Sequence, residues 1–254
     1  MLKRLHLLYV WLILAPLVAL STLLFGLLAM LLVRFLGPAR SARLSAVPWA
    51  RFGLLLSGVR TRLHGFEHIR PGQSYVIVAN HLSHFDIWVL YGWLGLDLRW
   101  VMKQELRKVP IIGVSCAALG HIFIDRSNRE AALASLDAAR DTLRGSTSIL
   151  FFPEGTRSRD GTLKPFKKGA FNMALDMQLP VLPVTINGSW DVLPPGTLQL
   201  TPGEISITVH APIAVSSLSH TDLDDLSNRA RDAIASALDT PALQPASHSF
   251  SRSD

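Results

Sequence analysis

The chain of 254 residues is long enough for one catalytic domain of ordinary size with a modest appendage. Hydrophobic residues make up 49% of it and charged residues 17%, a balance richer in apolar side chains than a typical soluble domain has. The net charge of +6 would suit a nucleic-acid partner, but the absence of zinc-finger spacing, of an aromatic RNA-binding motif and of a basic region with heptads argues against one.

The apolar excess lies at the amino-terminal end. Residues 5–33 contain no Asp, Glu, Lys or Arg, and a helix of that length exceeds the ~30 Å hydrocarbon core of a bilayer. No small-residue cleavage pattern follows, so we expect a membrane-anchoring helix over residues 5–36 rather than a cleaved signal peptide. Pro16 and Gly26 are possible kink sites and leave two arrangements open, because the helix either crosses the bilayer or turns back within one leaflet as a helical hairpin.

A second segment, residues 44–60, interleaves arginines with aromatic and leucine side chains, which favours a helix lying at the lipid interface. An ordinary amphipathic helix that covers the core has the same pattern. No acidic residue precedes Glu67, whereas arginines recur throughout this part of the chain. Such a basic segment is attracted to anionic headgroups and favours keeping the rest of the protein on the cytoplasmic side. We therefore predict that residues 1–60 form a membrane anchor.

Residues 61–239 predict an α/β domain, and the Ser- and Pro-containing residues 240–254 predict a disordered tail. Short β-rich runs alternate with longer helical stretches, which favours a central mixed sheet flanked by helices. A helix is expected to begin near Asn128 and to stop at Gly145, and a last helix to cover residues 221–238 with Thr221 as its cap. The predicted strands cover residues 75–79, 121–124, 148–152, 181–186 and 205–209.

Reactive side chains follow the first of these strands in the stretch "NHLSHFDIW". His81 comes just past the strand end, and Asp86 comes where a helix is expected to begin, so the turn can fold the carboxylate onto the imidazole. An Asp that accepts from one ring nitrogen leaves the other free to take a proton from a hydroxyl, as a general base does. Two alternatives remain, a purely structural hydrogen bond and a metal site made by His81, His84 and Asp86.

A second group of polar residues follows the predicted strand that ends at Phe152, in "FFPEGTRSRDGTLKPFKKGA". A turn that offers a glycine, a hydroxyl, a carboxylate and an arginine suits a phosphate group, although a solvated basic loop has the same composition. Between the two loops lie Lys103, Glu105 and Arg126, and Arg126 directly follows an apolar strand, where ligands of an α/β sheet are met.

The single cysteine, Cys116, lies in the small apolar run "VSCAALG" and cannot form an internal disulfide. A nucleophilic thiolate needs an exposed, electropositive setting. We therefore interpret Cys116 as a packing residue rather than as the carrier of an acyl-enzyme intermediate.

Four ordered blocks of this sequence resemble the glycerolipid acyltransferase family, and most closely the bacterial 1-acyl-sn-glycerol-3-phosphate acyltransferases. The block "NHLSHFD" is similar to the family's NHx4D motif, "GHIFIDR" to its GxxFIDR motif, "FPEGTRS" to its FPEGTR motif, and "LPVLPVTI" to its proline-containing fourth block. The resemblance covers roughly residues 60–215 and depends on the order and spacing of the blocks together.

The resemblance implies an acyltransferase that moves a fatty acyl group from acyl-CoA or acyl-carrier protein to the 2-hydroxyl of lysophosphatidate, giving phosphatidic acid. It implies a catalytic domain on the cytoplasmic side of a bacterial inner membrane, and neither a metal nor another cofactor. Acceptors such as glycerol 3-phosphate, other lysophospholipids or lyso-ornithine lipid remain alternatives, as does a non-catalytic lipid-binding protein. The residue roles that it implies are His81 as base with Asp86 as its partner, phosphate contacts from Lys103, Arg126 and Arg157, an acceptor site at Glu154, Gly155 and Thr156, and structural support from Pro183.

Overall fold

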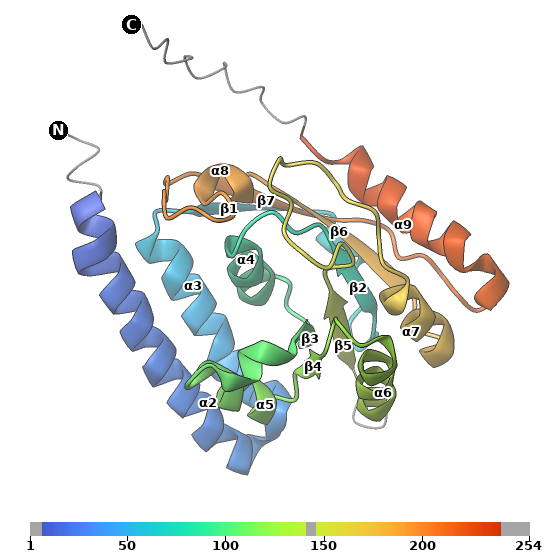
Figure 1. Ribbon diagram of the computed structural model, residues 1–254, viewed down its shortest axis with the longest axis horizontal. Helices are drawn as coiled ribbons and strands as arrows, with labels where there is room; N and C mark the ends of the chain where they lie inside the picture. The colour runs from blue at the N-terminus through green and yellow to red at the C-terminus, as the bar shows by residue number, and fades with distance from the viewer. Residues whose placement is uncertain (1–6, 141–145, 240–254) are drawn as a thin grey trace, which may run out of the picture.

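Seven strands form one mixed sheet in the computed structural model of the protein, which describes residues 7–140 and 146–239 (Figure 1). The strand order is β1-β7-β6-β2-β5-β3-β4. All neighbouring strands run parallel except β6 and β7, which are antiparallel. The strands are β1 (Arg60–His64), β2 (Val76–Ala79), β3 (Asp97–Lys103), β4 (Ile122–Ile124), β5 (Thr147–Phe151), β6 (Val181–Asn187) and β7 (Glu204–Val209).

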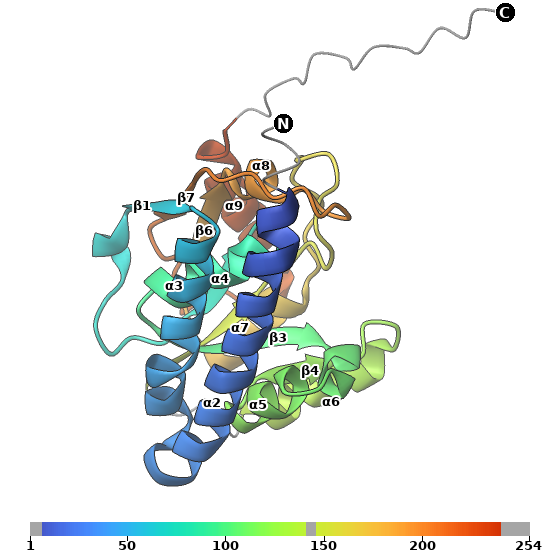
Figure 2. The same ribbon diagram turned by 90° about the vertical axis from the view of Figure 1, so that its left-hand side faces the viewer.

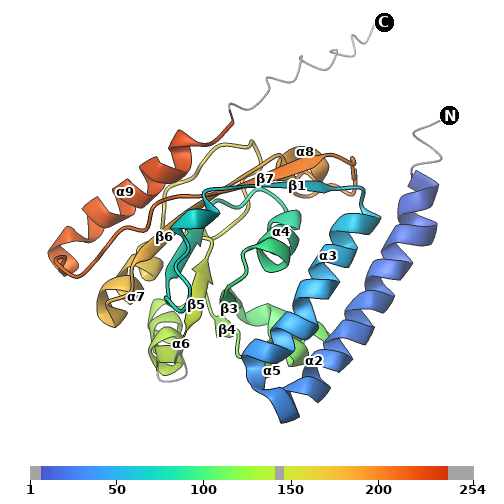
Figure 3. The same cartoon turned by 180° about the vertical axis from the view of Figure 1, so that it is seen from behind.

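The central strands are buried on both faces, which explains their continuous apolar sequences. In β2, Val76 and Val78 pack into the core on one face, and Ile77 and Ala79 pack into the core on the other. Figures 1 and 3 show how α3 and α4 cover one face while α6, α7 and α9 cover the other. The helices of the domain are α4 (Phe85–Trp93), α5 (Ile112–Ala118), α6 (Arg129–Arg140), α7 (Gly169–Met177), α8 (Ser189–Val192) and α9 (Leu223–Ser236), with short 3-10 helices η2 (Phe66–His68), η3 (Gln104–Lys108) and η4 (His220–Asp222).

The amino-terminal segment forms a helical hairpin against the first face. It consists of a π-helical turn, η1 (Val10–Leu14), followed by α2 (Ala15–Leu44) and α3 (Ala46–Leu56), which runs back alongside α2 (Figure 2). Trp49 Nε1 donates to Thr22 Oγ1 at 3.0 Å, and the Tyr9 hydroxyl donates to the Leu56 carbonyl at 2.6 Å. The described part of the chain has one helical stretch, Leu7–Leu56, that is long and apolar enough to cross a membrane, and this stretch indicates membrane association.

The turn of the hairpin lies at neither of the positions that the sequence pointed to. Pro16 lies inside the helical stretch Leu7–Leu56, just after the π-helical turn η1, and the backbone leaves helical geometry at Gly37, with φ of 73°. Gly26 instead provides a contact, because a Cβ there would lie 2.4 Å from Cγ2 of Ile111. Ile111 has φ of 63° in a γ-turn closed by the Ile112 N–H and the Pro110 carbonyl at 2.7 Å. The missing side chain at Gly26 therefore lets the turn dock on α2.

Two sequence predictions are wrong in detail, and two strands were missed. The strands β1 and β3 were not predicted, because β1 is a mostly exposed edge strand and the first half of β3 carries Asp97 and Arg99, which pair at 2.6 Å. The predicted helix at residues 44–60 ends at Leu56, since the chain enters β1. The last helical segment is capped by Ser219 rather than by Thr221. The predicted stop at Gly145 and the predicted tail at 240–254 lie outside the described residues.

Candidate active site

The carboxyl ends of the parallel strands β2, β5, β3 and β4 bring the predicted site residues to one edge of the sheet. The end of β2 is held in place by Asn80, which is fully buried and exchanges two hydrogen bonds of 2.8 Å with the backbone of Ile186 in β6. His81 follows at once. Its ring therefore projects from a fixed point of the sheet.

His81 and Asp86 form the predicted hydrogen bond, with Nδ1 2.8 Å from Oδ2. The same oxygen accepts from the backbone N–H groups of Leu82 and Ser83 at 2.7 and 2.8 Å. Asp86 is fully buried in the first turn of α4, and because its Oδ2 already accepts from two N–H groups, the ring nitrogen meets it as a donor. In the neutral imidazole this network assigns the proton to Nδ1 and leaves Nε2 as the free acceptor.

A second contact orients the His81 ring. Phe152, the residue directly after β5, stacks on the imidazole with ring centroids 3.8 Å apart and planes 9° apart. The side chain of His81 remains 15% exposed, so the ring is not fully enclosed by the protein. No sequence pattern predicts this contact, because it depends on β5 lying beside β2.

Glu154 links the histidine loop to the loop that carries the FPEGTR block. Its two carboxylate oxygens accept from the backbone N–H groups of His81 at 2.7 Å and Lys164 at 3.0 Å. Burial raises the pKa of Glu154 to about 7, although both backbone donors lower it. Next to it, Gly155 has φ of 77°, and its carbonyl accepts from the Arg126 guanidinium. Arg126 therefore braces this turn from the end of β4.

The three predicted phosphate contacts come from different parts of the sheet edge. Lys103 ends β3, and Arg126 follows β4. Arg157 follows β5 and lines an open hollow of about 520 Å³ together with Thr156, Arg159, Pro195 and Gly196. The Thr156 hydroxyl accepts from Lys164 Nζ at 3.4 Å. Convergence of Lys103, Arg126 and Arg157 on one phosphate stays a prediction. Pro183 lies within β6, opposite Val78 of β2, as expected for a supporting residue.

The arrangement of the described side chains does not match the metal site considered for His81, His84 and Asp86. Within residues 7–140 and 146–239, no group of three or more His, Cys, Asp or Glu side chains is arranged to hold a metal ion. His84 is an exposed side chain, yet neighbouring groups remove part of its hydration, and this desolvation and then the charge of Arg157 lower its pKa. That electrostatic contact places Arg157 beside the histidine loop.

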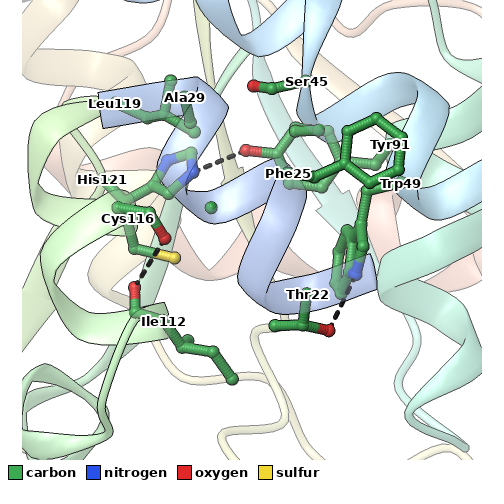
Figure 4. A pocket seen from close by; sticks show the side chains of 13 residues that line it. Thr22, Phe25, Ala29, Ser45, Trp49, Tyr91, Ile112, Cys116, Leu119 and His121 are labelled. Atoms are coloured by element: carbon green, nitrogen blue, oxygen red, sulfur yellow. Dashed lines mark hydrogen bonds between the residues drawn. The ribbon is translucent and has the colours of Figure 1, made fainter. Parts of the chain in front are cut away.

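An apolar cavity lies between the amino-terminal hairpin and the domain, lined by side chains of α2, α3, α4 and α5 (Figure 4). At its inner side the Tyr91 hydroxyl meets Nε2 of His121 at 2.5 Å. A row of aromatic rings connects this cavity to the catalytic loop, because Tyr91, Trp100 and Phe152 follow one another with centroids 5.1 and 5.9 Å apart. The cavity thus adjoins the same side of the sheet as His81.

Cys116 lines this cavity, and burial raises the pKa of its thiol to about 11. We therefore expect Cys116→Ser to keep near-normal turnover and its fold. The measurement is acyl transfer by the purified variant, combined with mass spectrometry of the wild type during turnover. An acyl group found on Cys116 would contradict direct transfer and favour a two-step thiol route.

Glu154→Gln tests the link between the two loops. A glutamine amide offers one oxygen, so one of the two backbone donors loses its acceptor, at a cost of about 1–3 kcal/mol. The wild-type carboxyl binds its proton more tightly in the folded state, so its contribution to stability falls as pH rises from 4.5 towards 7. Chemical unfolding should show a lower free energy of unfolding for the variant, and its difference from the wild type should narrow over this pH range. A difference that widens with pH would contradict the raised pKa.

A family model described as Acyltransferase matches residues 60–187. The chain is 38% identical over 169 residues to a 1-acyl-sn-glycerol-3-phosphate acyltransferase of Chlamydomonas reinhardtii, covering 66% of this chain and 49% of that protein. It is 36% identical over 183 residues to a putative enzyme of the same name from Caenorhabditis elegans, a match that covers 71% of this chain and 65% of that protein. It is 32% identical over 177 residues to the human alpha enzyme, a match that covers 69% of this chain and 62% of that protein. The chain thus spans about half to two thirds of the length of these relatives.

A crystal structure of the 1-acyl-sn-glycerophosphate acyltransferase of Thermotoga maritima has a similar fold, with a TM-score of 0.62. The match covers 86% of this chain and 97% of that protein, at 24% sequence identity. At this identity the likeness concerns the fold alone.

Proposed function

The chain belongs to the acyltransferase family, and we propose that it transfers a fatty acyl group to the 2-hydroxyl of 1-acyl-sn-glycerol 3-phosphate, forming phosphatidic acid. The observation that carries this proposal is the His81–Asp86 pair, in which a buried carboxylate holds Nδ1 and leaves Nε2 as the proton acceptor. A binding protein has no need of an imidazole oriented in this way. The names of the relatives support the choice of acceptor.

The reaction requires one proton acceptor and no covalent enzyme intermediate. Nε2 of His81 removes the hydroxyl proton as the oxygen attacks the thioester carbonyl of acyl-CoA or acyl-carrier protein. Asp86 stabilises the imidazolium that forms. When the carbon–sulfur bond breaks, the imidazolium returns its proton to the departing thiolate. The new ester bond, the free thiol and the neutral imidazole balance the reaction.

Product analysis tests the function. Purified full-length protein is incubated with acyl-CoA or acyl-carrier protein and a panel of lyso-acceptors, and the products are identified by mass. We expect phosphatidic acid from lysophosphatidate. Preference for lyso-ornithine lipid or another acceptor without a phosphate monoester would overturn the acceptor assignment. An absence of thioester consumption with every acceptor would instead indicate a lipid-binding protein.

We further propose that residues 1–60 anchor the catalytic domain, residues 61–239, on the cytoplasmic face of a bacterial inner membrane. The hairpin supports entry into one leaflet, because α3 returns alongside α2 and is docked on the domain. The outward side of α2 carries the exposed side chains of Leu20, Leu24, Leu27, Leu31 and Phe35. An exposed apolar stripe of this length suits acyl chains better than water.

Replacing Leu24, Leu27 and Leu31 by glutamine should shift much of the protein from the membrane to the soluble fraction, because each loses apolar surface that contacts lipid. The residual binding should be sensitive to salt, since the arginines of the hairpin act through screened attraction to anionic lipid. Leu198→Gln is the control, because Leu198 is at least as exposed as these leucines but lies outside the hairpin. Equal membrane fractions for the triple variant and the control would contradict the proposed anchor.

A further inference from the structure

The hollow beside the histidine loop is lined by Arg159, a residue that lies outside the four family blocks. Arg157 and Arg159 both line it, together with Thr156 and the turn at Pro195 and Gly196. We propose that Arg159 is the second guanidinium of the acceptor-phosphate site and that the Arg157–Arg159 pair selects phosphate monoesters over diesters. This inference rests on the proposed acyl transfer to lysophosphatidate and specifies how its headgroup is recognised.

The backbone between the two arginines explains why both reach the same hollow. Ser158 is fully buried, its N–H donates to the His81 carbonyl at 2.9 Å, and its hydroxyl donates to Asp160 Oδ1 at 2.7 Å. Ser158 is held inward, whereas Arg157 is half-buried, Arg159 is exposed, and both line the same hollow. The same hydrogen bond to the His81 carbonyl ties this segment to the catalytic loop.

The charges around the hollow favour an anion with more than one negative charge. In the described parts of the chain, neither Arg157 nor Arg159 forms an ion pair with a carboxylate. Asp160, the nearest acid in sequence, accepts instead from Ser158 and from the N–H and hydroxyl of Thr162. Lys164 Nζ adds a third cation beside the turn, donating to the Arg157 carbonyl at 3.0 Å.

A phosphate monoester fits this arrangement better than a diester does. A monoester approaches two negative charges at neutral pH and presents three terminal oxygens, so that two guanidinium forks can each make paired hydrogen bonds. A diester carries one charge and two unbridged oxygens, which one fork already occupies. Loss of the second arginine should therefore affect the monoester far more.

The test compares Arg159→Gln and Arg159→Lys with the wild type in the full-length protein. Acceptors are lysophosphatidate and a lysophospholipid with a diester headgroup, and the Michaelis constants of acceptor and acyl-CoA are measured separately. If the diester is turned over too slowly, it is added as a competitive inhibitor instead. Arg229→Gln is the matched control, because Arg229 is an exposed arginine of α9 that pairs with Asp225.

We expect Arg159→Gln to lower kcat/KM for lysophosphatidate by tenfold to a hundredfold, the range of one lost charge-assisted interaction. The kcat/KM for the diester and the Michaelis constant for acyl-CoA should change little. Arg159→Lys should recover only part of the loss with lysophosphatidate. Equal losses for both acceptors, no loss for either, or a loss confined to acyl-CoA would each overturn the inference. A wild type that fails to acylate any acceptor would instead refute the proposed function, so the two failures are distinguishable.

Discussion

Replacing His81 by alanine should lower the turnover number by roughly 10²- to 10⁴-fold, the usual contribution of a positioned general base. Nε2 of His81 takes the hydroxyl proton in the proposed mechanism. The hydrogen bond to Asp86 and the stacking on Phe152 orient the ring, which is partly exposed. The Michaelis constant for the acceptor should change much less, because the ring acts on the proton rather than on the headgroup. Steady-state rates with lysophosphatidate and acyl-CoA measure both quantities.

The control for His81→Ala is His64→Ala, the same substitution at an exposed histidine of the edge strand β1. Its turnover should match the wild type. Circular dichroism and thermal unfolding must show that the His81 variant is folded, because the ring also stacks on Phe152. Near-normal turnover in a folded His81→Ala protein would contradict the assignment of the base.

Asp86→Asn should reduce turnover by a hundredfold or more while preserving the shape of the loop. The asparagine oxygen can replace Oδ2 and still accept from His81 Nδ1 and from the backbone N–H groups of Leu82 and Ser83. Its amide nitrogen takes the place of Oδ1, which is buried and has no hydrogen-bond partner among the residues that the structure describes. The main loss is the negative charge that stabilises the imidazolium, and this loss acts on the transition state.

Comparison with Asp86→Ala separates charge from structure. Alanine leaves the N–H groups of Leu82 and Ser83 without their acceptor, so this variant should lose stability as well as turnover. The asparagine variant should lose turnover with a much smaller change in unfolding temperature. If both variants unfold alike while the folded asparagine protein keeps full turnover, Asp86 has a structural role only.

Local spacing explains why the pair itself was predictable. His81 and Asp86 belong to one loop and the first turn of the helix that follows it, so a few backbone angles decide whether they meet. The apolar run of the first helix was equally visible, since a long run without charged residues is a property of composition, whereas the hairpin that this helix forms with α3 was not. The β-rich runs at β2, β5 and β6 were recognisable because strands covered on both faces are continuously apolar.

The sequence by itself therefore determined the fold class, the apolar amino-terminal segment and the histidine–aspartate pair. Only the tertiary structure decided that Phe152 stacks on His81, that Glu154 joins two loops, and that Arg159 shares a hollow with Arg157. It also placed β1 beside β7 and β3 beside β5, two strands whose polar residues interrupt the apolar pattern that predicts a strand. The physical reason is that these contacts depend on which strands lie side by side, and hydrophobic periodicity records which face of a segment is buried but not which neighbour covers it.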